Sequence, residues 1–183
     1  SNILSKINVT NCMEILNEPD KYVKKNVKLC GLIFNIQKRQ SLRGRWVSIQ
    51  LNDLSGSVDI NIYSDVLIKY EDHLIEKNLI LIDAEIKNEN NQINRIVVKR
   101  IYSLNDYISD NKYNITLFTN SNKHLDKLVP LLGILEVGYS DILISCSNKE
   151  RQVEIKIKEN IKLSSKFIND LSTISGIDHI RFS

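Results

Sequence analysis

Two adjoining segments with alternating apolar and polar residues constrain the fold of this chain more than any other feature. Residues 47–52 and 58–62 each alternate strictly, which is typical of strands with one buried face. Between them, Asp53-Leu54-Ser55-Gly56 has Asp at the first and Gly at the fourth position of a β-turn. The sequence therefore predicts a β-hairpin over residues 47–62.

The segments around this hairpin complete a five-stranded unit. The predicted elements are a strand over 28–36, the two hairpin strands, a helix over 65–75, and strands over 79–86 and 93–101. This order is that of an OB-fold, a small Greek-key barrel with its helix between the third and fourth strands. We therefore expect a five-stranded OB-fold barrel over residues 25–108, preceded by a lead-in helix within residues 1–24.

A polar stretch at residues 103–112 indicates a boundary to a second unit. The 183 residues are long enough for two small domains. Over residues 112–183 the patterns predict strand, helix, two strands, helix and strand, an order found in ferredoxin-like domains. The expected fold class is α+β and mainly β, a five-stranded OB-fold barrel followed by a small β-α-β-β-α-β domain.

Basic residues gather just before the first strand of the hairpin. From Lys21 to Gln50 the chain has eight Lys or Arg and no Asp or Glu, although its net charge is only +3. OB barrels bind single strands with cations that follow the phosphates and with rings on which bases stack. We expect residues 37–45 to form a basic loop beside such a face. The candidate nucleic-acid-binding residues are Lys38, Arg39, Arg43, Arg45, Trp46 and Tyr63. The alternative is a solvated basic surface, with both rings packed at the rim of the core.

No pattern predicts an active site, a metal site or a cofactor, and we expect no small-molecule ligand. The three histidines lie in unrelated segments, and no phosphate-cradling glycine motif occurs. Cys12, Cys30 and Cys146 lie far apart without a CxxC pair, which predicts reduced thiols in a cytoplasmic protein. No apolar run reaches the roughly 20 residues of a membrane span, so we expect no membrane partner.

Motifs in both predicted units match those of one protein family. They are Cys30-Gly31-Leu32-Ile33, Arg43-Gly44-Arg45, residues 51–60, Tyr63-Ser64-Asp65, residues 125–132 and residues 158–164. These segments resemble the C-terminal region of the bacterial replicative DNA polymerase III alpha subunit. The resemblance implies an OB domain followed by the family's last domain, which docks the tau subunit of the clamp loader. It also implies that the catalytic aspartates of this DNA-directed DNA polymerase, a nucleotidyltransferase, lie upstream.

The chain departs from the family in two places. It has Asn52-Asp53 where two acidic residues are usual, and its basic loop is one residue shorter. The shorter loop leaves open which cation meets which phosphate.

From the residues and the resemblance together we expect a non-catalytic fragment that acts in chromosomal DNA replication in the bacterial cytoplasm. Its barrel would bind single-stranded template DNA, and its last domain would bind tau and so join the replisome. A tRNA- or RNA-binding OB module, such as the anticodon domain of a synthetase, is an alternative because a similar LxDxSG hairpin recurs there. A protein-docking piece whose barrel has lost strand binding is a third hypothesis.

Overall fold

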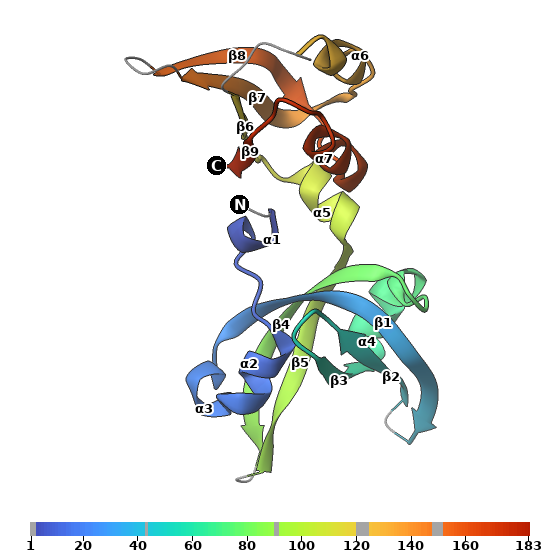
Figure 1. The fold of residues 1–183 in the computed structure, drawn as a ribbon. Coiled ribbons are helices and arrows are strands. Elements are labelled where there is room, and N and C mark those ends of the chain that lie inside the picture. Colours follow the sequence, from blue (N-terminus) through green and yellow to red (C-terminus); the bar gives the residue numbers. More distant parts are fainter. Residues whose placement is uncertain (1–2, 43, 90–91, 120–124, 148–151) are drawn as a thin grey trace. The chain divides into compact units, whose positions relative to one another are not determined.

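Two β-rich units make up the computed structural model, which describes residues 3–42, 44–89, 92–119, 125–147 and 152–183 (Figure 1). One unit contains Asn8–Leu104, and the other contains Ser1–Ile7 together with Asn105–Ser183. Within the described ranges, no helix is long and apolar enough to cross a membrane. The predicted class, mainly β with antiparallel strands and some helices, is confirmed.

The first unit is built on an antiparallel sheet of five strands. They are β1 (Asn26–Ser41), β2 (Gly44–Asn52), β3 (Ser57–Tyr63), β4 (Leu79–Glu89) and β5 (Gln92–Ser103). The spatial order is β3-β2-β1-β4-β5, because the long β1 pairs with β4 along its first half and with β2 along its second (Figure 1). As predicted, a helix follows β3: α4 (Ser64–Tyr70) continues into a 3-10 turn (Glu71–His73).

The predicted hairpin is confirmed, and Asp53 fixes its turn. The Asp53 carboxylate accepts hydrogen bonds from the backbone N–H of Ser55 (2.7 Å) and of Gly56 (3.0 Å). Its second oxygen accepts the N–H of Cys12 at 2.7 Å, while the Ser55 hydroxyl accepts the N–H of Met13 at 3.2 Å. The turn therefore supplies partners for the first N–H groups of α2 (Cys12–Asn17), which the helix itself leaves unpaired.

Alternation along the hairpin strands sends every second side chain into the core. Three residues of β2 and three of β3 are at most 7% exposed, namely Val47, Ile49, Leu51, Val58, Ile60 and Ile62. They pack in one cluster with aliphatic residues of β1, β4 and β5. Burying each such side chain stabilises the fold by about 1.5–3 kcal/mol before entropy is counted. The opposite face of the hairpin is thereby left to polar and aromatic side chains.

The five-stranded sheet differs in one respect from the predicted closed barrel. In the described residues no hydrogen-bonded ladder joins its two edge strands, β3 and β5. Instead α2 lies along the gap, where Ile15 and Leu16, with Val58 of β3 and Ile96 of β5, line a groove of about 540 Å³. The expected single lead-in helix consists of α1 (Ile3–Lys6), α2 and α3 (Pro19–Tyr22).

The second unit has the predicted order of elements. They are β6 (Ile115–Thr119), a 3-10 turn (Leu125–Lys127) with α6 (Leu128–Gly133), β7 (Val137–Ser147), β8 (Gln152–Ile161), α7 (Ser165–Ser172) and β9 (His179–Phe182). The predicted helix cap is also present, because the Ser164 hydroxyl accepts the N–H of Phe167 at 3.1 Å. Where a polar boundary was expected, the chain forms α5 (Leu104–Asp110), with Leu104 and Ile108 buried one turn apart.

The ferredoxin-like expectation for this unit is wrong. In that fold a third strand separates the two strands of the first β-α-β unit. Here β6 and β7 are direct parallel neighbours, and the sheet order is β8-β7-β6-β9. The β7–β8 hairpin therefore places β8 at the sheet edge instead of between β7 and β6.

Candidate nucleic-acid interface

The face of the β2–β3 hairpin that points away from the core combines polar side chains with two rings. The register pairs Trp46 with Tyr63, Ser48 with Asn61, Gln50 with Asp59 and Asn52 with Ser57. All eight residues alternate with the buried aliphatic ones, so all belong to the outer face. The aromatic pair lies at the end where β2 begins and β3 ends.

Trp46 and Tyr63 are the centre of a row of four side chains that crosses the outer face. The two ring centroids are 6.1 Å apart, with an interplanar angle of 29°. Arg39, opposite Trp46 in the β1–β2 ladder, holds its guanidinium 5.5 Å from the Trp46 ring centre. Arg95 of β5 holds its guanidinium 4.6 Å from the Tyr63 ring centre. We call Arg39, Trp46, Tyr63 and Arg95 the stacking row.

The stacking row is ordered by its own contacts but remains accessible. Each guanidinium is attracted by the electron-rich face of its ring, and the two rings attract each other. Tyr63 is 42% exposed, Arg39 is exposed, and Trp46 and Arg95 are half-buried. Flat rings that flank each other and reach solvent are suited to contact the bases of an unpaired strand, since every base has a π-face.

The predicted basic loop over residues 37–45 is absent. β1 continues to Ser41 and β2 begins at Gly44, so only residues 42 and 43 connect the strands. Gly44 has a φ of +119°, and a Cβ there would lie 2.6 Å from the Ser64 hydroxyl oxygen. A side chain at this position would therefore be strained in its backbone and also clash. Arg43 lies outside the described residues.

Strand geometry separates the remaining predicted cations. Arg39 lies opposite Trp46, but Lys38 lies opposite Val47, and Arg45 directly precedes Trp46. Because side chains alternate between faces, Lys38 and Arg45 point away from the stacking row. The Lys38 ammonium also lies 3.1 Å from a carboxylate oxygen of Glu71. Of the predicted residues, the structure thus brings together Arg39, Trp46 and Tyr63, and it places Lys38 and Arg45 elsewhere.

Arg95 was not among the predicted site residues. Its own segment shows nothing unusual, because Arg in a polar stretch before β-branched residues is ordinary for an exposed strand position. The signal lay in the predicted topology, in which the third and fifth strands approach each other. Only that non-local neighbourhood brings Arg95 to Tyr63.

The two thiols under the hairpin lie in an environment that disfavours their thiolate forms. Burial, with a further contribution from Asp53, raises the pKa of Cys12 to about 12 and that of Cys30 to about 11. Both remain protonated, and a thiol is a poor nucleophile. In the part of the chain that is described, no three His, Cys, Asp or Glu residues lie close enough to hold a metal ion.

The second unit also carries a ring pair, on the sheet face opposite its aliphatic core. Phe118 of β6 and His179 of β9 are stacked, with centroids 4.0 Å apart and planes within 10°. The Arg181 guanidinium lies 4.9 Å from the Phe118 ring centre and 3.1 Å from a carboxylate oxygen of Glu154. This stack is therefore accompanied by a paired cation.

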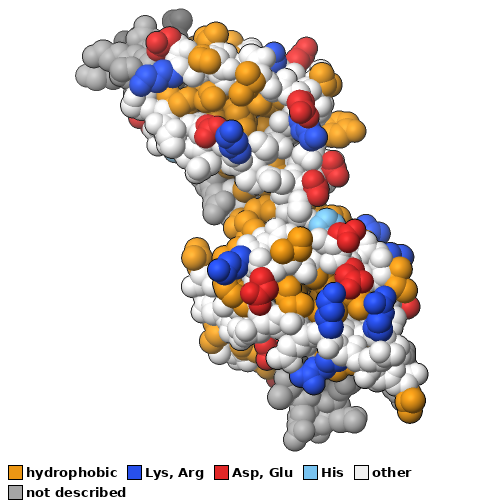
Figure 2. Space-filling view, turned by 90° about the vertical axis from the view of Figure 1, so that its right-hand side faces the viewer, with side chains coloured by type: hydrophobic (Ala, Val, Ile, Leu, Met, Phe, Trp, Pro, Cys, Tyr) orange, Lys and Arg blue, Asp and Glu red, His pale blue; other side chains and the backbone are white. Residues whose placement is uncertain are grey.

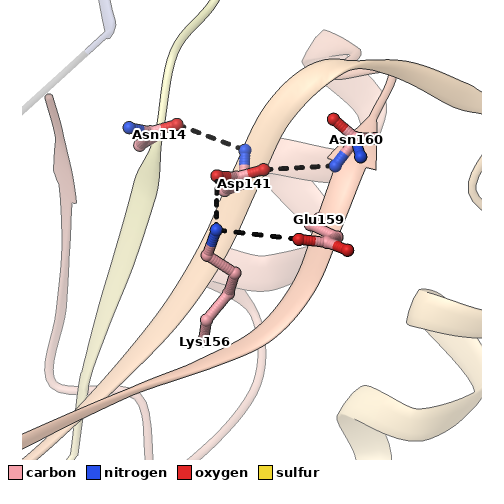
Figure 3. A network of polar contacts seen from close by, with 5 residues as sticks. All are labelled: Asn114, Asp141, Lys156, Glu159 and Asn160. Carbon is pink, nitrogen blue, oxygen red and sulfur yellow. Dashed lines mark hydrogen bonds and ion pairs between the residues drawn. The ribbon is translucent and has the colours of Figure 1, made fainter.

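A second ion pair lies on the β7–β8 part of the same sheet (Figure 3). The Lys156 ammonium lies 3.0 Å from the carboxylate of Asp141 and 3.7 Å from that of Glu159. Asp141 also accepts the N–H of Asn160, and Lys156 together with that N–H lowers the pKa of the Asp141 carboxyl. Arg181 and Lys156 on this sheet thus both have acidic neighbours.

Comparison with known proteins finds relatives of a single kind, although no protein-family model matches the chain. The chain is 28% identical over 133 residues to DNA polymerase III subunit alpha of Rickettsia felis. It is 27% identical over 133 residues to that of Rickettsia conorii, and 24% identical over 132 residues to that of Rickettsia prowazekii. Each match covers 72% of this chain but only 11% of the relative.

Proposed function

We propose, since the chain is homologous to a segment of the DNA polymerase III alpha subunit, that it is a non-catalytic part of a replicative polymerase that holds single-stranded template DNA. The observation that carries the proposal is the stacking row on an exposed sheet face. Because the relatives are about nine times longer than the match, polymerase activity is assigned to parts of the protein outside this chain.

We propose further that the first unit is a partly open OB-fold. Three features support this assignment: the strand order β3-β2-β1-β4-β5, the helix between β3 and β4, and the approach of the edge strands. In OB-folds the face of the second and third strands binds oligonucleotides. That face carries the stacking row here.

In this proposal the bases contact the rings and the arginines contact phosphates. A base would need roughly 7 Å between ring planes to slot between Trp46 and Tyr63, twice the about 3.5 Å contact distance of carbon atoms. The centroid distance of 6.1 Å is too short for that without rearrangement. Bases that stack on the exposed edges and outer surfaces of the stacking row require less movement of the rings than bases inserted between them. Arg39 and Arg95 would then turn to the phosphates. Such contacts are independent of base identity.

The second unit is proposed to dock the tau subunit of the clamp loader. Apolar side chains there are widely exposed, at 68% for Val129, 78% for Ile134 and 87% for Val137. Figure 2 shows hydrophobic side chains gathered among charged ones on this unit. A groove of about 390 Å³ lies between α5, α6 and α7, lined by Leu131, Ile134 and Phe167 with polar neighbours. Such a surface is typical of a protein interface.

Holding both functions on one chain would strengthen each of them. A weak grip on template becomes effective when a second contact keeps the polymerase nearby, because binding then occurs at a high effective concentration. The 183-residue chain would thus contribute retention on the template while catalysis takes place elsewhere in the parent protein.

The chain contains one tryptophan, Trp46, so its fluorescence reports directly on the proposed site. We expect titration with oligo-dT to quench this fluorescence and the affinity to fall steeply with salt. Purified tau should bind the same chain without changing the quenching. No quenching and no retention of oligo-dT at low salt would refute the DNA proposal. A clear preference for tRNA would favour an RNA-binding module. Binding of tau without binding of DNA would favour a protein-docking piece.

A further inference from the structure

Five cations occupy the outer face of β1, β4 and β5, on the other side of the gap from β3. They are Lys28 of β1, Lys87 of β4, and Arg95, Lys99 and Arg100 of β5. Along their strands these cations lie next to buried residues such as Leu29, Ile86 and Ile96. Because successive side chains of a strand point to opposite faces, the five cations belong to the solvent side. We call these five residues the cationic band.

Two carboxylates lie within the cationic band and neutralise only part of it. Asp83 forms an ion pair with Lys28, and Glu85 lies 2.9 Å from Lys99 and 3.9 Å from Lys87. Among the described side chains of this face, five cations and two carboxylates give a formal net charge of +3. These ion pairs also hold the lysine side chains in place. Lys99 in turn keeps the pKa of the Glu85 carboxyl below its usual range.

The band is hollowed at one end. A groove of about 360 Å³ is lined by Lys28, Asp83, Lys99 and Arg100. It lies where the β4–β5 register shifts between Asp83 and Ala84, a β-bulge that adds one residue to β5. The bulge turns both Lys99 and Arg100 toward solvent, so two cations come from consecutive residues.

The stacking row and the cationic band complement each other. Beside the rings, the charge of Arg39 on β1 and that of Asp59 on β3 cancel, so the outer face of β2 and β3 has little net positive charge. The band has the cations, but its described residues include no comparable ring pair. Arg95 belongs to both, because it lies over Tyr63 and opposite Lys87 in the β4–β5 ladder.

We propose that a DNA strand bound at the stacking row continues past Arg95 across the gap between β3 and β5, and that the cationic band holds its phosphates. This inference rests on the proposed single-strand binding and adds its path and its extent. From β5 across β4 to β1 the band spans two strand spacings, about 10 Å. A strand that ends at the rings leaves this part of the surface unused, so the inference predicts a dependence on oligonucleotide length.

The test uses the full chain with oligo-dT of about 5 and about 15 nucleotides, lengths within the range of 4–16 that OB-folds occupy. We expect the double variant Lys99→Gln/Arg100→Gln to bind the long oligonucleotide roughly 5- to 30-fold more weakly than the unaltered chain. Its slope of log affinity against log salt should fall by about 1.4, which is about 0.7 for each lost phosphate contact. Binding of the short oligonucleotide should be unchanged.

Lys158→Gln/Lys166→Gln is a matched control, because it removes two exposed cations from the other unit. It should bind both oligonucleotides as the unaltered chain does. If Lys99→Gln/Arg100→Gln lowers the affinity for both oligonucleotides equally, or for neither, the path over the cationic band is refuted. The proposal of single-strand binding then still stands. If the unaltered chain binds neither oligonucleotide, both proposals fail. Unfolding followed by Trp46 fluorescence verifies that each variant is folded.

Discussion

On the five-stranded sheet, Trp46 and Tyr63 stack between Arg39 and Arg95. On the four-stranded sheet, Phe118 and His179 stack beside one arginine, Arg181. Both sheets thus carry a stacked ring pair, but the charged residues around the two pairs differ. Arg181 forms an ion pair with Glu154, and Lys156 has two acidic neighbours, whereas the first sheet continues into a band with a net charge of +3.

The difference shows that stacked rings alone do not define a nucleic-acid site. A ring pair on a sheet is a normal cross-strand contact that stabilises the sheet by about 0.2–1 kcal/mol. Single-strand affinity comes largely from cations that replace the counterions of the phosphates. Where nearby carboxylates balance the cations of a surface, that gain is smaller. The comparison therefore supports the proposal that DNA binds the first sheet and that a protein partner binds the second unit.

The largest expected effect comes from removing one ring of each pair. Trp46→Ala should weaken oligo-dT binding by about 1–3 kcal/mol, roughly 5- to 150-fold, because a base loses its stacking partner. Phe118→Ala should leave oligo-dT affinity unchanged within about twofold, since the arginine beside its ring, Arg181, is already paired with Glu154. Fluorescence anisotropy of a labelled oligonucleotide measures both, because Trp46→Ala removes the intrinsic signal.

Trp46→Phe is the appropriate control for the first variant, since it keeps a stacking ring and should retain most of the affinity. Equal losses in Trp46→Ala and Phe118→Ala would show that both sheets bind DNA, and the contrast drawn from charge would then be wrong. Thermal unfolding by circular dichroism separates loss of binding from loss of fold.

The next effect concerns one carboxylate in each unit. Asp53 accepts backbone N–H groups from its own turn and from α2, whereas Asp141 accepts one N–H and a lysine at the surface. Asp53→Ala should lower the free energy of unfolding by about 1.5–3 kcal/mol, as expected for hydrogen bonds to a charged group. Asp141→Ala should cost about 1 kcal/mol or less, because its partner Lys156 is 49% exposed and an ion pair open to solvent contributes little. Urea unfolding followed by circular dichroism compares them.

The Asp53 effect should also depend on pH. Burial alone would raise the pKa of Asp53, but hydrogen bonds from Ser55, Cys12 and Gly56 outweigh it and hold the pKa below its usual value. A carboxyl group with a lowered pKa in the folded state stabilises the fold above the pKa of the unfolded chain. This contribution is lost as the pH falls from about 5 through the folded-state pKa, so Asp53→Asn should flatten that part of the stability curve. An unchanged curve would contradict the role of the turn.

The features that could be predicted from sequence are those set by neighbouring residues. Alternation over 47–62 predicts the hairpin, and the Asp53 turn and the Ser164 cap each depend on a side chain and backbone within three residues. The helix in residues 104–110 was missed because its polar composition hid the buried pair Leu104 and Ile108.

What could not be predicted depends on pairing between distant segments. The extent of β1 determines whether Lys38 and Arg39 share a loop or lie on opposite faces, and that extent is set by β2 and β4. The contact between Arg95 and Tyr63 requires β5 to approach β3. The order of the second sheet likewise follows from where β8 pairs, which alternation alone does not specify.

The smallest effect tests the comparison in the opposite direction, by freeing a cation on the second sheet. Glu154→Gln removes the carboxylate that lies 3.1 Å from the Arg181 guanidinium, and it keeps the length of the side chain. One uncompensated cation next to the Phe118 and His179 stack should raise oligo-dT affinity about twofold at low salt, and the gain should vanish at high salt because exposed charges are screened.

Glu159→Gln, which removes a carboxylate 3.7 Å from Lys156 and away from the rings, controls for the change in net charge. A larger gain in Glu154→Gln than in Glu159→Gln would mean that the ring pair of the second sheet can bind a base and that its acidic neighbour prevents it. Equal gains would mean that only total charge matters there, and the second sheet would then be no nucleic-acid site at all.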